Sequence, residues 1–172
     1  MLKQTDLETI KKLNIKDPRI ILATWFGTGL LSPAPGTWGT LGALPFGIAI
    51  LAFGGIKALI IAVIIITALG YWSAKSFEDQ TGTHDNNTHD NKMIVIDEVA
   101  GMWLTLCAIT SITPLQILTA FALFRFFDIL KPWPISYLDK HVGGALGVMA
   151  DDILAGAIAA LCLWGLIYAG LI

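Results

Sequence analysis

The chain has 172 residues, of which 55% are hydrophobic and only 14% are charged, with a formal net charge of -2. Soluble domains carry about 25% charged residues, so this composition and a mean hydropathy of +0.71 indicate a single membrane domain over residues 1–172. The lack of a basic excess argues against a nucleic-acid partner. Cys107 and Cys162 have no metal or redox spacing and are expected to be packed thiols.

Residues 2–17 are polar, with apolar residues at roughly helical spacing among lysines. They lack the apolar core of a secretory signal, and their pattern predicts an amphipathic helix on a membrane surface over residues 1–17. The apolar run 20–31 is shorter than the roughly 20 residues of an upright span. Because a proline-rich turn follows it, we expect a re-entrant or interfacial segment.

The rest of residues 18–172 predicts an all-α, polytopic membrane helical bundle with about five transmembrane helices. The apolar runs are 38–53, 56–72, 93–109, 115–127 and 150–172, and residues 135–140 are expected to lie along the interface. With a cytoplasmic N-terminus, this threading leaves only Lys57 outside, as the positive-inside rule requires. Both acidic pairs described next then lie on the cytoplasmic face.

Two acidic pairs stand in or at the start of apolar runs, namely Asp97-Glu98 and Asp151-Asp152. An ionised side chain within hydrocarbon costs roughly 2.5–3.5 kcal/mol on insertion scales, so each pair requires a cation, a basic partner or a wet cleft. With Asp128 they give five carboxylates near the ends of three helices. Such hard oxygen ligands suit Mg²⁺ or Mn²⁺. The simpler interpretation is that acids at helix N-termini complement the helix dipole.

A glycine follows one member of each pair by four residues, Gly101 after Asp97 and Gly156 after Asp152. Small residues allow close helix approach, so we expect these two helices to bring their carboxylates together. Neighbours on a helix point about 100° apart. We therefore expect Asp97 and Glu98 to divide between a metal ion and a neighbouring basic side chain.

The loop at residues 32–40 is a candidate phosphate site, because glycines and hydroxyls precede a helix N-terminus there. It lacks the Gly-Lys-Ser/Thr ending of a P-loop, and a plain proline-terminated turn is an equally good interpretation. Arg125 could clamp a phosphate or pair with a carboxylate. Lys92 and Lys131 could contact a head group or simply mark the cytoplasmic side.

A tandem Thr-His-Asp-Asn repeat places His84 and His89 five residues apart, without a third ligand at convincing spacing, so no zinc site is predicted. The sequence also lacks Cys-x5-Arg, Asp-x-Asp-x-Thr/Val and the basic sets of histidine-nucleophile lipid phosphatases. Metal-assisted attack of water on a phosphomonoester fits what remains. A divalent-cation or proton transporter is the alternative. A CDP-alcohol phosphotransferase is disfavoured, because its Asp-Gly-x2-Ala-Arg motif is missing.

Four ordered motifs extend over about residues 18–170. They are FGTGL at 26–30 with SPAPGTWGT at 32–40; Asp90 with IVIDEVAGMW at 94–103; FRFFD at 124–128 with KPWPI at 131–135; and GG at 143–144 through DDILAG at 151–156. Together they resemble the phosphatidylglycerophosphatase A family. The tandem repeat departs from the single His-Asp expected, and the spacing to Asp97 makes His84 and Asp85 the extra copy.

The resemblance implies a Mg²⁺-dependent, multi-pass phosphatase of the bacterial inner membrane, active on the cytoplasmic face. It would remove the terminal phosphate of phosphatidylglycerophosphate to give phosphatidylglycerol, with membrane lipids as its partners and an oligomeric state left open. The expected catalytic and metal-ligating residues are Asp97, Glu98, Asp128, Asp151 and Asp152. The expected substrate-binding residues are Ser32, Gly36, Thr37, Thr40, His89, Asp90, Lys92, Arg125 and Lys131.

Overall fold

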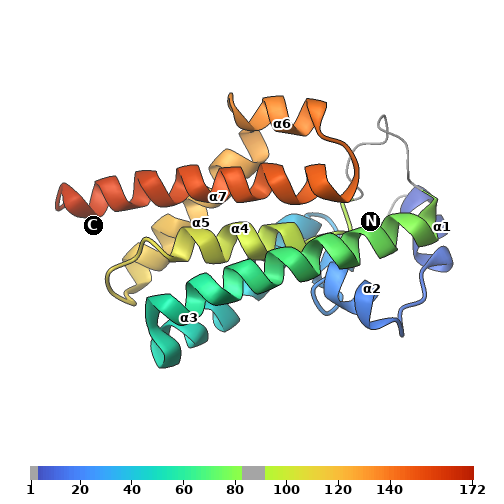
Figure 1. The fold of residues 1–172 in the computed structure, drawn as a ribbon, viewed down its shortest axis with the longest axis horizontal. Coiled ribbons are helices and arrows are strands. Elements are labelled where there is room, and N and C mark those ends of the chain that lie inside the picture. The colour runs from blue at the N-terminus through green and yellow to red at the C-terminus, as the bar shows by residue number, and fades with distance from the viewer. Residues whose placement is uncertain (1–3, 83–91) are drawn as a thin grey trace.

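The computed structural model describes residues 4–82 and 92–172, and within these ranges its regular elements are helical, as the all-α prediction requires (Figure 1). The elements are α1 (Gln4–Lys12), α2 (Pro18–Ala23), the 3-10 helix η1 (Thr28–Leu30), α3 (Pro35–Thr81), α4 (Ile96–Leu106), α5 (Pro114–Leu130), α6 (Ile135–His141) and α7 (Gly144–Tyr168).

Helix α3 is broken at Gly55, where the predicted boundary between two apolar runs lies. Gly55 has φ 70° and ψ -176°, a conformation open to glycine because it lacks a Cβ. The chain turns back at this point, so that Pro35 and Thr81 lie toward the same end of the bundle (Figure 1). One 47-residue element therefore supplies two antiparallel legs.

The first leg of α3 packs closely on α4 through a stripe of small residues. A Cβ added at Gly39 would lie 2.6 Å from the Cβ of Val95, and one at Gly47 would lie 2.7 Å from Trp103. The indole nitrogen of Trp103 donates a hydrogen bond to the carbonyl oxygen of Ala43 at 2.8 Å. Because almost all of α4 is buried, this contact places α4 at the centre of the bundle.

The predicted close approach of α4 and α7 is confirmed. A Cβ added at Gly156 would lie 2.9 Å from the Cα atom of Gly101. The hydroxyl of Thr105 donates to the carbonyl oxygen of Gly156 at 3.2 Å, which ties the two backbones together. Since each of these helices carries an acidic pair, their contact brings the pairs to one place.

Among the described residues, two helices are long and apolar enough to cross a membrane, Pro35–Thr81 and Gly144–Tyr168. The prediction of about five transmembrane helices is not supported by this criterion. Helix α4 has 11 residues and α5 has 17, short of the roughly 20 of an upright span. For α4 the reason is local, because the apolar run 93–109 begins and ends in non-helical turns.

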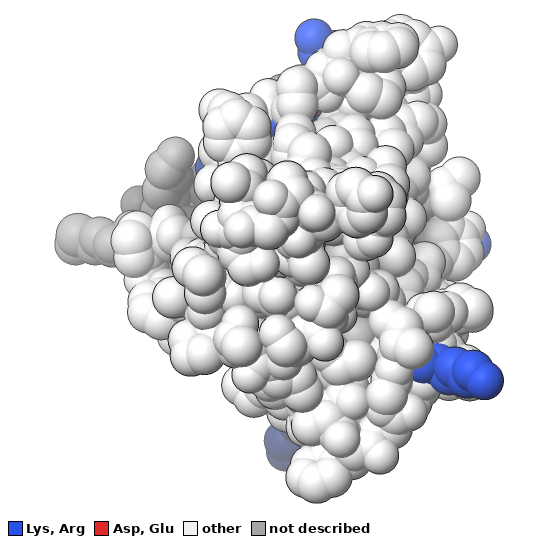
Figure 2. Space-filling model, turned by 90° about the vertical axis from the view of Figure 1, so that its left-hand side faces the viewer, with Lys and Arg blue, Asp and Glu red and all other residues white. Residues whose placement is uncertain are grey.

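Charge is distributed unevenly along the bundle. Figure 2 shows the end at which α3 reverses and the C-terminus lies, and this face is almost entirely uncharged. At the other end, the N-terminal segment lies against the end of α3. Gln80 accepts a hydrogen bond from the backbone of Asn14 at 3.0 Å and donates one to the carboxylate of Asp17 at 3.1 Å. The expected surface helix is shorter than predicted, since α1 ends at Lys12.

Candidate functional site

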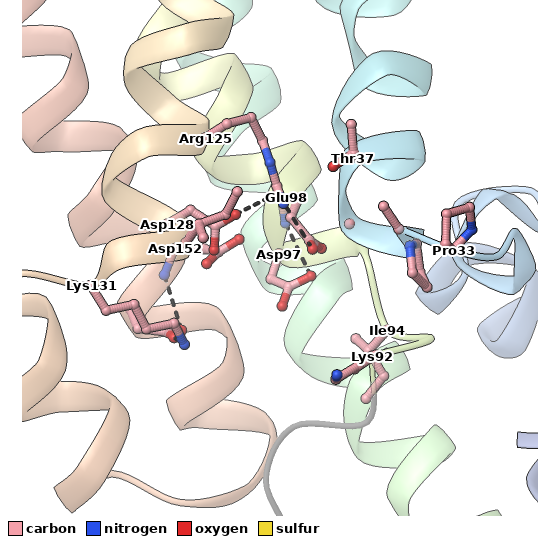
Figure 3. A pocket seen from close by; sticks show the side chains of 15 residues that line it. Pro33, Thr37, Lys92, Ile94, Asp97, Glu98, Arg125, Asp128, Lys131 and Asp152 are labelled. Atoms are coloured by element: carbon pink, nitrogen blue, oxygen red, sulfur yellow. Dashed lines mark hydrogen bonds and ion pairs between the residues drawn. The ribbon is translucent and has the colours of Figure 1, made fainter. Parts of the chain in front are cut away.

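A cleft of about 440 Å³ opens at the end of the bundle where α3, α4 and α7 begin and α5 ends (Figure 3). It combines carboxylates, basic side chains and the loop that leads into α3. Its lining residues are Pro33, Ala34, Pro35, Gly36, Thr37, Lys92, Ile94, Asp97, Glu98, Arg125, Asp128, Ile129, Lys131, Asp151 and Asp152. The predicted carboxylates and basic residues of the described chain therefore share one cavity.

Three of the carboxylates converge. One oxygen each from Asp97, Glu98 and Asp152 lies within 4.8 Å of the others, and the side chains of Asp97 and Asp152 are only 8% and 3% exposed. Within the described residues, Oε2 of Glu98 and Oδ2 of Asp152 are buried without a hydrogen-bond partner. Buried carboxylate oxygens without partners are costly. This donor set fits a hard divalent cation such as Mg²⁺.

Asp97 and Glu98 were expected to divide between a metal ion and a basic side chain, and the structure places oxygen atoms of both in the three-carboxylate group. The short backbone turn at the start of α4 lets Oδ1 of Asp97 accept a hydrogen bond from the amide of Glu98 at 3.0 Å. Glu98 also lies 3.9 Å from the guanidinium of Arg125. It therefore borders both the carboxylate group and a basic side chain.

Arg125 is held from two sides. Its guanidinium forms an ion pair with Asp128, one turn further along α5. It also donates to the hydroxyl of Thr40 at 3.3 Å, and that hydroxyl in turn donates to the carbonyl oxygen of Gly36 at 2.8 Å. Thr40 is fully buried and does not line the cleft. Thr40 therefore holds Arg125 from outside the cleft lining, whereas the sequence predicted that Thr40 would contact the substrate directly.

Lys131 bridges two helices. It ends α5 in a left-handed conformation, with φ 42° and ψ 54°, and its ammonium group bonds both Asp139 of α6 and Asp151 of α7. Burial opposes the charge on Lys131, but the hydrogen bonds to Asp139 and Asp151 outweigh it and raise the pKa of Lys131 above its ordinary value. Asp139 was not predicted from the sequence, because no motif relates it to a lysine eight residues earlier.

The five carboxylates therefore fall into two groups. Asp97, Glu98 and Asp152 converge, and Glu98 and Asp152 each keep one oxygen atom without a hydrogen-bond partner, whereas Asp128 and Asp151 each form a close ion pair with a basic side chain. This division could not be inferred from the two acidic doublets, because the members of each doublet look equivalent in the sequence. It depends on which carboxylates lie near Arg125 and Lys131, at the C-terminal end of α5.

The first turn of α3 approaches the carboxylates closely because it contains a glycine, Gly36. A Cβ added at Gly36 would meet Oε1 of Glu98 and lie 3.2 Å from the guanidinium of Arg125. The first turn of α3, which includes Thr37, lines the cleft, and its backbone N–H groups have no cap from the side chain of Ala34. A helix N-terminus of this kind favours anions.

The remaining predicted contacts are spread more widely. Lys92 is exposed and lines the cleft, and Figure 3 shows it across the opening from Lys131. Ser32 is exposed and is not among the lining residues. His89 and Asp90, with the extra copy at His84 and Asp85, lie outside the described residues, so their expected roles stay predictions.

Comparisons with known proteins agree with one another. The family model described as phosphatidylglycerophosphatase A matches residues 21–167. A phosphatidylglycerophosphatase A from Haemophilus influenzae is 40% identical over 164 residues, covering 95% of this chain and 98% of the relative. One from Escherichia coli is 36% identical over 149 residues, covering 87% and 83%.

A third relative has a different printed activity. A putative phosphatidylinositol-3-phosphatase from Bacteroides thetaiotaomicron is 36% identical over 143 residues, covering 80% of this chain and 86% of the relative. No solved structure matches the chain. The names of all three relatives refer to phosphatases whose substrates are phosphorylated lipids.

Proposed function

Because the chain belongs to the phosphatidylglycerophosphatase A family, we propose that it hydrolyses the terminal phosphomonoester of phosphatidylglycerophosphate to phosphatidylglycerol and inorganic phosphate. The observation that carries this proposal is the convergence of Asp97, Glu98 and Asp152 beside Arg125 in a cleft at the end of an apolar bundle. A phosphate group is bound by cations and N–H donors, and the cleft holds both kinds of group.

Asp97, Glu98 and Asp152 are the residues that would hold Mg²⁺, which is supported by their convergence and by the unpartnered oxygen atoms of Glu98 and Asp152. When bound, the ion neutralises phosphate charge and polarises the phosphoryl group. We do not assign Asp128 and Asp151 to the ion, in contrast to the first expectation, because each already pairs with a basic side chain. They hold Arg125 and Lys131 in the wall of the cleft.

The basic residues and the start of α3 would bind and orient the phosphate. Arg125 presents a planar guanidinium suited to phosphate oxygens. The backbone of Gly36 and Thr37 adds the favourable end of a helix dipole. Lys92, at the rim of the cleft, contributes a further positive charge.

In the proposed reaction, the oxygen atom of water forms a bond to phosphorus as the bond from phosphorus to the glycerol oxygen breaks. One proton of the water passes to a carboxylate of the cleft and is then returned to the leaving glycerol oxygen, so that protons balance. Asp128 is our candidate for this proton, because it lines the cleft outside the three-carboxylate group.

We further propose that five helical segments lie in a bacterial inner membrane, with the cleft on the cytoplasmic face. These segments are the two legs of α3 and the helices α4, α5 and α7. Helix α5 supports this arrangement although it is short, because its outward residues Leu115, Leu118 and Phe126 are 56%, 66% and 54% exposed. Such an apolar surface is unfavourable in water and favourable in lipid. The transporter alternative is not favoured, because the carboxylates gather at one end of the bundle (Figure 3).

The test is release of inorganic phosphate from phosphatidylglycerophosphate in detergent micelles, with Mg²⁺ and with EDTA. Wild-type protein is expected to release phosphate only with Mg²⁺. Phosphatidylinositol 3-phosphate serves as a comparison substrate, because one relative carries that activity in its name. Lack of phosphate release from folded protein with Mg²⁺ would contradict the phosphatase proposal. Phosphate release in EDTA would contradict only the proposed requirement for Mg²⁺.

A further inference from the structure

Asp139 shares the ammonium group of Lys131 with Asp151. It lies on α6 and does not line the cleft. Its side chain is 30% exposed, compared with 24% for Lys131 and 3% for Asp151. The three residues form a chain of charges that leads from the protein surface to the wall of the cleft.

The inner end of this chain adjoins the three-carboxylate group. Oδ1 of Asp151 accepts a hydrogen bond from the backbone amide of Asp152 at 3.0 Å, and Asp152 belongs to that group. A carboxylate as buried as Asp151 needs a cationic partner, which Lys131 provides. The position of this single ammonium group therefore decides how much negative charge surrounds Asp152.

Lysine is a compact point charge on a flexible four-carbon stem. Without the bond to Asp139, the ammonium group of Lys131 would be held less firmly and could move toward the densest negative charge nearby, which is the group formed by Asp97, Glu98 and Asp152. In that place it would compete with a divalent cation for the same oxygen atoms. The bond from Asp139 opposes this movement, because it draws Lys131 toward α6.

We propose that Asp139 is a positioning residue that acts through Lys131, keeping its ammonium group beside Asp151 and leaving the three-carboxylate group to a divalent cation. The inference rests on the proposed function, since it takes Asp97, Glu98 and Asp152 as the cation ligands. It adds α6, which carries no residue of the cleft lining, to the parts of the chain that determine cation affinity.

The test measures binding of Mn²⁺, a spectroscopic substitute for Mg²⁺, to full-length protein in detergent by electron paramagnetic resonance. Asp139→Asn is expected to weaken binding by about threefold to tenfold, in the lower part of the range for residues in one salt-bridge network. Asp139→Glu, which restores the carboxylate, is expected to bind within about twofold of wild type. Glu8→Gln removes the same charge from an exposed position on α1 and is the matched control.

A double-mutant cycle separates a relay through Lys131 from a long-range charge effect. In a Lys131→Met background, Asp139→Asn is expected to have no further effect on Mn²⁺ binding. An equal weakening in both backgrounds, or unchanged binding in Asp139→Asn, would overturn the role of Asp139. If Lys131→Met does not fold, the comparison of Asp139→Asn with Asp139→Glu decides whether the carboxylate at position 139 is needed for Mn²⁺ binding. Equal binding by these two variants would overturn the role of Asp139.

The outcome for wild-type protein separates the two proposals. If wild-type protein binds Mn²⁺ but Asp139→Asn binds it equally well, only the positioning role fails. If wild-type protein binds no Mn²⁺, the proposed cation site fails and the positioning role fails with it. Thermal unfolding of each variant shows whether a loss of binding reflects a loss of fold.

Discussion

Asp97 is a proposed ligand in an electrostatically unfavourable position. It is buried beside two other carboxylates whose oxygen atoms lie within 4.8 Å of one another. Like charges in a low-dielectric site repel strongly, so this residue destabilises the fold whenever no cation is present. Functional sites commonly carry such local costs.

Replacing Asp97 with asparagine is therefore expected to change activity and stability in opposite directions. Mg²⁺-dependent phosphate release should fall by about 100-fold or more, equivalent to at least ~2.7 kcal/mol of transition-state stabilisation. In EDTA the melting temperature should stay the same or rise, because repulsion is relieved. Kinetic assays and thermal unfolding of the same preparations test both effects, and a variant that is both active and less stable would contradict this assignment.

The absence of a side chain at Gly36 leaves space for the side chains of Glu98 and Arg125. Gly36→Ala is expected to reduce phosphate release by about tenfold or more, since its methyl group would meet Glu98 and crowd Arg125. The melting temperature should change much less than the rate, because the methyl group points into the cleft and can displace the two side chains. Steady-state kinetics are the measurement. A variant with wild-type activity would show that the close contact of Gly36 with Glu98 and Arg125 is unimportant for activity.

At the scale of elements, the contact between α4 and α7 assembles the carboxylate group. The site residues of these helices are separated by more than 50 positions in the sequence, and the glycines at the crossing allow their backbones to touch. Such glycine contacts are typical of membrane helices, where close packing replaces the hydrophobic effect. The crossing also sets the distance between Asp97 and Asp152.

Gly156→Ala is accordingly expected to destabilise the protein by about 1–3 kcal/mol, the usual cost of overpacking. It should also reduce activity, because it separates α4 from α7. Gly165→Ala is the matched control on the same helix, since a Cβ there meets nothing within 4 Å. Thermal unfolding and phosphate release are measured for both variants. Equal effects of the two substitutions would contradict the role of the crossing.

The N-terminal segment should respond to acid through Asp17. Hydrogen bonds from Arg19 lower the pKa of Asp17 to about 2, and aspartate in an unfolded chain titrates near 3.9. Because the folded pKa is the lower one, the contribution of Asp17 is fully present above about pH 4 and is lost as the pH falls toward 2.

Asp17→Asn is therefore expected to make the N-terminal segment more susceptible to limited proteolysis at pH 7. The difference from wild type should disappear on acidification toward pH 2, as shown with an acid-active protease. A difference that persisted at low pH would mean that the charge of Asp17 is not what holds this segment to Gln80.

At the scale of the whole molecule, much of the helical order was predictable, because apolar periodicity and glycine or proline punctuation are local signals. The break at Gly55 and the end of α5 before Lys131 lie where the sequence places them. The start of α7 does not: it begins at Gly144 rather than near residue 150. In its glycine-rich first turn, Gly147 lies so close to the carbonyl oxygen of Val142 that a Cβ would clash with it, a contact that the sequence does not reveal.

The candidate site was only partly predictable, because the contacts between its residues are not local in the sequence. Composition identifies the acidic and basic residues, but their pairing depends on tertiary contacts. The bond from Lys131 to Asp139 requires the turn between α5 and α6, and the support of Arg125 by Thr40 joins residues 85 positions apart. No local pattern encodes either contact.

Orientation in the membrane gives a prediction for the entire bundle. Lys57, next to the reversal of α3, and Lys140, on α6, are expected on opposite sides. With Cys107→Ala and Cys162→Ala as background, Lys57→Cys should react with a membrane-impermeant thiol reagent added to spheroplasts. Lys140→Cys should react only after permeabilisation. The reverse pattern would place the cleft on the periplasmic side.

The crossing of Gly101 and Gly156 also has a consequence for biosynthesis. Asp97 and Glu98 are translated long before Asp152, and the three converge only where α4 meets α7. A nascent chain that ends before α7 therefore carries an incomplete set of ligands. The proposed catalytic centre can therefore form only after α7 has been synthesised, and a prematurely terminated chain is expected to show no phosphatase activity.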